Sequence, residues 1–320
     1  MTIRTLLAAT FASALLLGGC ATNLSTLQTA DTVSAPGIRV GGGAGMYVPA
    51  DAVMREMDPR VCASSLRDEG EEGVTACFSD EYVELLRSIQ TGDAPPLDPS
   101  DPEDEERIRE MFHNAVALAL FPPAPMAEIS MRAGLASNVD AGVRLTPLSA
   151  RGDVKWRMVG GGEAENFSLA VLGGAEYFMY DFLFGDVQEF LQDRYDLFAH
   201  IEVKNPRRAD AELALIGSGE ILTILHPYAA LKYRAGMFEI PLVLHIEHPD
   251  HDPVAVEDTV SGLIHYAGGT AGMGVGWRFL RAFAEVTAMM AVSNAAILGE
   301  YVDVGGLTVY PSLGLAIELP

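Results

Sequence analysis

Three histidines and several carboxylates lie within eight consecutive residues, His245-Ile-Glu-His-Pro-Asp-His-Asp252. Imidazole and carboxylate groups bind zinc and harder cations, so His245, His248 and His251 are candidate metal ligands. Two prolines interrupt this stretch, and Asp- and His-rich hairpin tips are common in proteins. We therefore predict a loop at a hairpin tip and assign neither a metal nor another cofactor.

A serine, a histidine and an acid that could form a hydrolytic triad occur at Ser168, His200 and Glu202. Some outer-membrane barrels are lipid hydrolases that use such a set. However, the chain contains no Gly-x-Ser-x-Gly segment, which would place a nucleophilic serine on a sharp turn. A hydrogen-bonded network of polar side chains is the favoured interpretation, and we predict that the protein is not an enzyme.

The overall charge limits the partners that this protein can bind. The 320-residue chain carries 21 Lys and Arg against 44 Asp and Glu, which gives a net charge of −23, yet 49% of its residues are hydrophobic. A nucleic-acid backbone requires Lys and Arg to displace its counterions, so nucleic acid is excluded as a partner. A polybasic attachment to anionic lipid headgroups is excluded for the same reason.

The first twenty residues have the parts of a secretory signal. One positive charge at Arg4 precedes an apolar run from Thr5 to Leu17, which is too short to span a bilayer as a helix. Leu17-Gly-Gly-Cys20 resembles the lipobox of bacterial lipoproteins, in which the cysteine becomes the first residue and carries a diacylglycerol and a palmitate. The resemblance implies lipidation at Cys20, and Ala21 implies passage to the outer membrane.

Two other cysteines, Cys62 and Cys77, would remain after lipidation of Cys20. In the oxidising compartment that a secretory signal implies, a disulfide between them is the natural interpretation. Two free buried thiols are the alternative.

The signal, the anchor and two regions of different composition divide the chain into four parts. We predict a signal peptide at 1–19, a lipid anchor and flexible tether at 20–50, an acidic periplasmic segment at 51–125 and a β-barrel at 126–320. Residues 51–110 hold 18 acidic and 6 basic side chains. Within this segment we expect a short helix near 82–89, an extended linker at 93–106 and a helix at 108–120. Its charge makes a periplasmic protein a candidate partner.

After about residue 126, apolar and polar residues alternate, which is typical of strands with one apolar face. We expect eight to ten strands, with residues 205–224 left ambiguous. The expected strands are 127–136, 139–146, 153–158, 167–179, 194–203, 226–235, 238–248, 271–279, 281–292 and 307–319.

The length of these strands and the aromatic residues near their ends favour a barrel in a membrane. The region resembles bacterial outer-membrane β-barrels, which implies an all-β, closed antiparallel barrel with a polar interior. The predicted polar network of the lumen comprises Arg144, Asp153, Lys155, Arg157, Glu176, Arg194, Asp196, His200, Glu202 and Arg278.

Together these features predict a lipoprotein of the cell outer membrane with a structural, tethering or narrow-pore role and with membrane lipid as its partner. A lipid-anchored periplasmic soluble barrel that binds an apolar ligand is the first alternative, and an outer-membrane lipid hydrolase is the second. The two barrels differ in the face that points inward at 153–158 and 194–203. The sequence identifies no small-molecule ligand.

Overall fold

The computed structural model describes residues 23–46, 48–49, 85, 88–120, 125–160, 166–179, 201–204, 206–221, 223–277 and 279–319. Several predictions fall outside these residues: the signal peptide, lipidation of Cys20, the Cys62–Cys77 disulfide and the lumen positions of Arg194, Asp196, His200 and Arg278.

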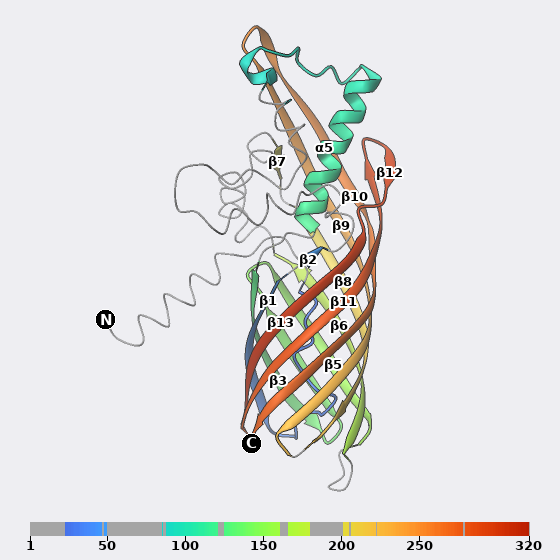
Figure 1. Ribbon diagram of the computed structural model, residues 1–320. Helices are drawn as coiled ribbons and strands as arrows, with labels where there is room; N and C mark the ends of the chain where they lie inside the picture. Colours follow the sequence, from blue (N-terminus) through green and yellow to red (C-terminus); the bar gives the residue numbers. More distant parts are fainter. Residues whose placement is uncertain are drawn as a thin grey trace, which may run out of the picture.

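Ten antiparallel strands close into one barrel (Figure 1). They are β1 (Ile38–Met46), β3 (Pro125–Ala136), β4 (Val139–Leu145), β5 (Ser149–Val159), β6 (Phe167–Phe178), β8 (Arg207–Gly219), β9 (Leu225–His248), β10 (His251–Trp277), β11 (Leu280–Ile297) and β13 (Gly306–Leu319). The first strand closes the barrel by pairing with the last, from Ile38 opposite Leu319 to Gly45 opposite Ser312. The predicted all-β closed barrel is confirmed.

The polar faces of the strands point into the barrel. In β5, Asp153 and Lys155 are buried, whereas Val154 and Trp156 are each 51% exposed on the outer wall. Exposed aromatic residues such as Phe167 and Trp277 lie at strand ends, where a membrane barrel has its aromatic girdle. An apolar exterior around a charged interior is the reverse of a soluble barrel and fits a lipid-embedded wall.

The two ends of the barrel differ in their connections. At the end where β13 finishes, which we call the short-turn end, the strands are joined by residues 137–138, 160–166, 220–224 and 278–279. At the opposite, long-loop end, the connections include residues 47–124 and 179–206 and the tall β9–β10 hairpin, which rises far above the barrel (Figure 1).

The described elements outside the barrel lie at the long-loop end, and we call them the extra-barrel unit. They are helix α5 (Pro102–Leu120), the short strands at 201–203 and 300–302, and the upper part of the β9–β10 hairpin. Helix α5 shares a core with the upper β9–β10 hairpin, where Ile108 and Phe112 belong to the same buried cluster as Leu244. The helix begins earlier than predicted, inside the expected linker. The Asp101 carboxylate accepts a hydrogen bond from the Glu103 backbone nitrogen at 2.9 Å, and such a cap, followed by proline, is a favourable helix start. Among the described residues, no helix is long and apolar enough to cross a membrane.

Two further strands also lie outside the barrel. Strand β7 (Ile201–Val203) pairs with β9, and β12 (Glu300–Val302) pairs with β11. The expected barrel strand at 194–203 is therefore corrected, because its described part belongs to the extra-barrel unit. The ambiguous region at 205–224 instead supplies barrel strand β8, and the two expected strands at 226–235 and 238–248 are one strand, β9.

The prediction of a flexible tether at 20–50 is also corrected. Residues 38–46 form β1, which is hydrogen-bonded on both sides, to β3 and β13, and β2 (Val48–Pro49) pairs with β13 as well. The glycines that made this stretch resemble a tether are wall residues. An added Cβ at Gly43 would lie 2.5 Å from the Leu27 side chain, so this glycine leaves room for Leu27 inside the barrel.

The exposed band of the wall predicts a depth-dependent cost for a charge. Leu231, 69% exposed, pairs with Leu215 and Gly269 in the middle of the wall, whereas Leu135, 62% exposed, lies at the short-turn end of β3. Leu231→Arg is expected to lower the free energy of unfolding in phospholipid vesicles by about 2–4 kcal/mol, and Leu135→Arg by about 0–1 kcal/mol. Equal costs in denaturant titrations of the two variants would contradict the placement of this band in lipid.

Candidate functional site in the barrel lumen

The chain's own N-terminal residues occupy the interior of the barrel. We call Asn23–Val33 the lumen segment; it has no helix or strand structure and runs along the inside of the wall (Figure 1, darkest blue). Asn23 hydrogen-bonds Glu128 of β3, three residues from the long-loop end of that strand. Val33 hydrogen-bonds Asp140, the second residue of β4 at the short-turn end. The segment therefore passes through most of the lumen.

Wall side chains accept hydrogen bonds from the backbone amides of the lumen segment. The Glu285 carboxylate accepts from the backbone nitrogens of Thr26 at 2.5 Å and Leu27 at 2.8 Å. The Asp140 carboxylate accepts from Val33 nitrogen at 2.9 Å. A buried peptide group without a partner is costly, and a segment that lies outside the sheet has no neighbouring strand to supply one.

Basic side chains of the wall donate to the carbonyl oxygens of the same segment. Lys232 donates to Leu24 at 2.5 Å, and Arg144 donates to Ser25 at 2.8 Å and to Thr26 at 3.1 Å. Near the short-turn end, Lys155 donates to the carbonyl oxygens of Thr29 at 3.1 Å and Asp31 at 2.7 Å. The wall thus binds the backbone of the segment, while the segment's side chains are mostly small or uncharged.

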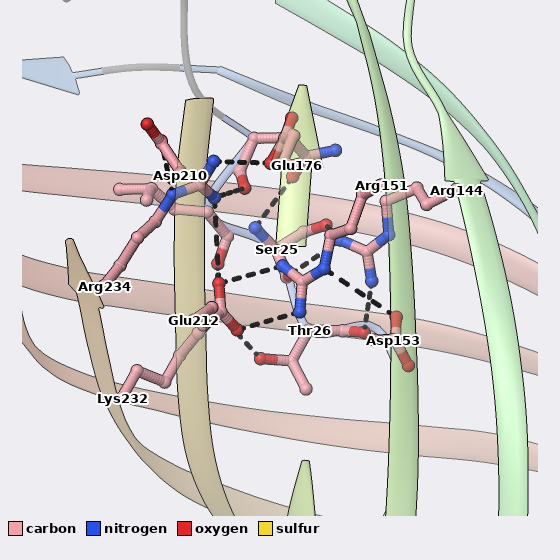
Figure 2. A network of polar contacts seen from close by, with 12 residues as sticks. Ser25, Thr26, Arg144, Arg151, Asp153, Glu176, Asp210, Glu212, Lys232 and Arg234 are labelled. Carbon is pink, nitrogen blue, oxygen red and sulfur yellow. Dashed lines mark hydrogen bonds and ion pairs between the residues drawn. The ribbon is translucent and has the colours of Figure 1, made fainter. Parts of the chain in front are cut away.

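Ion pairs within the wall hold these side chains in place (Figure 2). Arg151 forms a two-pronged pair with Glu212 at 2.8 and 3.0 Å. Arg234 bridges Glu176 at 2.5 Å and Asp210 at 2.7 Å. Each pair joins different strands, so the network braces the wall across the lumen as well as binding the segment.

The lumen is almost electrically neutral although the protein is strongly acidic. Among the described residues, eight basic and seven acidic side chains are buried. The basic ones are Arg39, Arg132, Arg144, Arg151, Lys155, Arg208, Lys232 and Arg234; the acidic ones are Glu128, Asp140, Asp153, Glu176, Asp210, Glu212 and Glu285. Charges removed from water must be balanced by partners, and the lumen meets this requirement within itself.

Little open space remains beside the segment. A cavity between the segment and the wall, lined by Thr26, Arg39, Glu128 and Arg144, measures about 30 Å³. This is room for one or two water molecules. This cavity has no space for a larger solute.

The structure places the predicted lumen residues in three different locations. Arg144, Asp153, Lys155 and Glu176 are buried in the lumen. Arg157 is only half-buried and donates to the Ser137 carbonyl oxygen at 2.8 Å, at the short-turn rim. The assignment of Glu202 to the lumen is corrected, because it lies on β7 of the extra-barrel unit, exposed and 3.3 Å from His245.

Several charged residues of the lumen were not predicted from the sequence. Asp210 and Glu212 lie in the region at 205–224 that was left ambiguous. Lys232 and Arg234 alternate with apolar residues in a predicted strand, but they were not assigned to the lumen. The alternation of inward and outward positions along both stretches could have assigned these side chains to the lumen. Nothing in the pattern indicated that the N-terminal residues are the ligand of these side chains.

Of the predicted triad, His200 lies outside the described residues, and the structure does not bring Ser168 and Glu202 together. Ser168 lies at the short-turn end and donates to the Asp31 carboxylate at 2.7 Å, whereas Glu202 lies in the unit at the opposite end. His248 and His251 meet edge to face at the tip of the β9–β10 hairpin, with ring centroids 4.6 Å apart. Within the described residues, no three His, Cys, Asp or Glu side chains are arranged to hold a metal ion.

No family model matches the chain, and no curated protein matches it. Among the solved structures that match are the outer membrane protease OmpT from Escherichia coli, with 8% identity, a TM-score of 0.37 and coverage of 91% of this chain and 100% of that one. LpxR from Salmonella typhimurium has 8% identity, a TM-score of 0.27 and coverage of 87% and 99%. Ail, the attachment invasion locus protein of Yersinia pestis, has 7% identity, a TM-score of 0.20 and coverage of 88% and 97%.

The prediction that this protein is not an enzyme is corrected by this comparison. The similar structures include one that is named as a protease. The burial pattern of the wall, with apolar side chains outside and charged ones inside, supports an outer-membrane β-barrel.

The buried ion pairs predict a large cost for removing one charge. Glu212→Gln leaves Arg151 buried without its two-pronged partner, so we expect a loss of about 3–5 kcal/mol in the free energy of unfolding. The matched control is Glu257→Gln, which removes an exposed carboxylate 3.7 Å from Lys204 and should cost about 0–1 kcal/mol. Denaturant titration in lipid vesicles compares the two, and equal losses would show that the Arg151–Glu212 pair does not brace the wall.

Proposed function

We propose that this protein is a structural outer-membrane barrel whose lumen is closed by its own N-terminal segment and which carries the extra-barrel unit at the membrane surface. The observation that carries the proposal is the set of hydrogen bonds between wall side chains and the lumen segment, from Glu285 and Lys232 to Asp140 and Lys155. These contacts bind backbone groups of the segment from Leu24 to Val33.

A narrow-pore role is the competing interpretation, and the contents of the lumen argue against it. A ten-strand barrel has a small interior to begin with, and here side chains and the lumen segment fill it. The 30 Å³ cavity beside Thr26 is too small for a path. Displacing the segment would also leave Glu285, Lys155 and Arg144 without the backbone groups that they bind, which is unfavourable in a dry interior.

Lipidation of Cys20 is part of the same proposal. The lipobox resemblance at Leu17–Cys20 supports it, and so does the position of the next described residues. Asn23 lies in the barrel only three positions after Cys20, so a mature chain that starts at this cysteine would enter the barrel almost from its first residue. The lipid and the wall would then hold the protein in the membrane together.

Ion conductance in planar bilayers tests the closed lumen. The intact protein is expected to show no steady open current, because the segment and the wall side chains fill the lumen. A variant that lacks residues 23–33 should conduct, since the interior that remains is lined by charged groups. Heat-modifiable migration on a detergent gel shows whether the shortened variant is still a closed barrel. A steady current from intact protein, or a folded deletion variant that stays silent, would overturn the proposal.

Metabolic labelling with palmitate tests the anchor. The wild-type protein should incorporate the label and Cys20→Ser should not, because acylation requires the cysteine sulfur and amine. Cys62→Ser is the matched control and should label like the wild type. Equal labelling of wild type and Cys20→Ser, or no labelling of either, would refute lipidation at this residue.

A further inference from the structure

We propose that the lumen segment is a membrane crossing, which brings the chain preceding Asn23 out at the long-loop end, on the cell exterior. Cys20, with any lipid that it carries, would then lie at the outer leaflet and not in the periplasm. The part concerning lipid rests on the proposed lipidation of Cys20; the part concerning the path of the chain does not.

The direction of the segment follows from the order of its partners. Asn23 bonds to Glu128 and Arg234, in the half of the lumen towards the long-loop end. Farther along, Ala30 nitrogen donates to Ser218, the last residue but one of β8, at 3.1 Å. After Val33 the chain turns, with Gly37 nitrogen donating to the Ser34 carbonyl oxygen, and continues as β1 from the short-turn end.

Chain length then limits where Cys20 can be. Asn23 comes three positions after Cys20, so the extended chain between their Cα atoms spans at most about 11 Å. Reaching the short-turn end from Asn23 takes the whole segment from 23 to 33, and the cavity beside Thr26, about 30 Å³, is too small for a second pass of the chain at that level. The proposal therefore places the chain preceding Asn23 at the long-loop end, where Asn23 itself lies.

The connections identify the exterior end. Barrels of outer membranes have short periplasmic turns and longer extracellular loops. Here the two-residue turns 137–138 and 278–279 lie at one end, while the connections 47–124 and 179–206 and the tall hairpin lie at the other. By this rule the acidic segment and α5 are outside the cell as well, opposite to the periplasmic side expected from the sequence.

The chemistry of the lumen suits such a crossing. Glu285 accepts from main-chain amides, and Arg144 and Lys155 donate to main-chain carbonyl oxygens, so these contacts support a peptide in transit without a helix or a neighbouring strand. A bilayer excludes unpaired backbone from its core, but it tolerates irregular chain that is enclosed in protein. The barrel would thus carry its own N-terminus through the membrane.

Epitope tags in the full-length protein test the side of the membrane. One tag is placed between Ala21 and Thr22, one between Pro249 and Asp250 at the hairpin tip, and one between Ser137 and Asn138 in the short turn. In intact cells an antibody should bind the first two tags, and it should bind the third only after permeabilisation. The proposal is overturned if the Ala21 tag behaves like the Ser137 tag, or if the Ser137 tag alone is accessible in intact cells.

A disulfide trap tests the path without an insertion. In a Cys62→Ser, Cys77→Ser background, Ala30→Cys combined with Ser218→Cys should cross-link on mild oxidation and change the migration of the chain on a non-reducing gel. The control pair joins Ala30→Cys to Ser293→Cys, which lies near the long-loop end of β11, and should stay open. Cross-linking of the control pair alone would reverse the direction of the segment and overturn the proposal. Palmitate labelling is read separately, so a failed anchor and a failed crossing give different results.

Discussion

A peptide group buried away from water needs a hydrogen-bond partner, and this requirement governs both parts of the barrel. In the wall, neighbouring strands provide the partners, and closure between β1 and β13 leaves no open edge. In the lumen, the N-terminal segment has no neighbouring strand, so carboxylates, guanidinium groups and ammonium groups take that role. The charged side chains of the interior therefore supply hydrogen-bond partners to an irregular backbone that the barrel encloses.

This requirement also explains why so many charges can be buried in a protein of this size. A lone buried ion is expensive, but a carboxylate that accepts an amide hydrogen and also faces an arginine is compensated twice. Asp140 does both: it accepts from Val33 nitrogen and pairs with Arg132 at 2.5 Å. Balance inside the lumen leaves the acidic excess of the chain outside it, where water and ions can screen the charge.

The barrel could be predicted from the sequence because every strand repeats one local pattern, the alternation of apolar and polar residues. Alternation in segments such as 153–158 predicts the strands and their two faces, and the inward position of Lys155 then decides between lipid and water outside. The lumen segment could not be predicted. Residues 23–33 have neither a helical nor a strand period, and glycine-rich 41–45 resembles a tether by composition. Only contacts between residues more than a hundred positions apart, such as Ser25 with Glu128, reveal what this stretch does.

The continuity of the lumen segment with β1 has a consequence for how the barrel is made. Because β1 is itself the seam strand that pairs with β13, the wall closes around a segment to which it is covalently joined. If acyl chains are attached just beyond Asn23, they are too bulky to be drawn back through the filled interior. The lumen segment would then be held in the closed barrel by the acyl chains at one end and by its covalent link to β1 at the other. It could leave the lumen only if the β1–β13 seam opened.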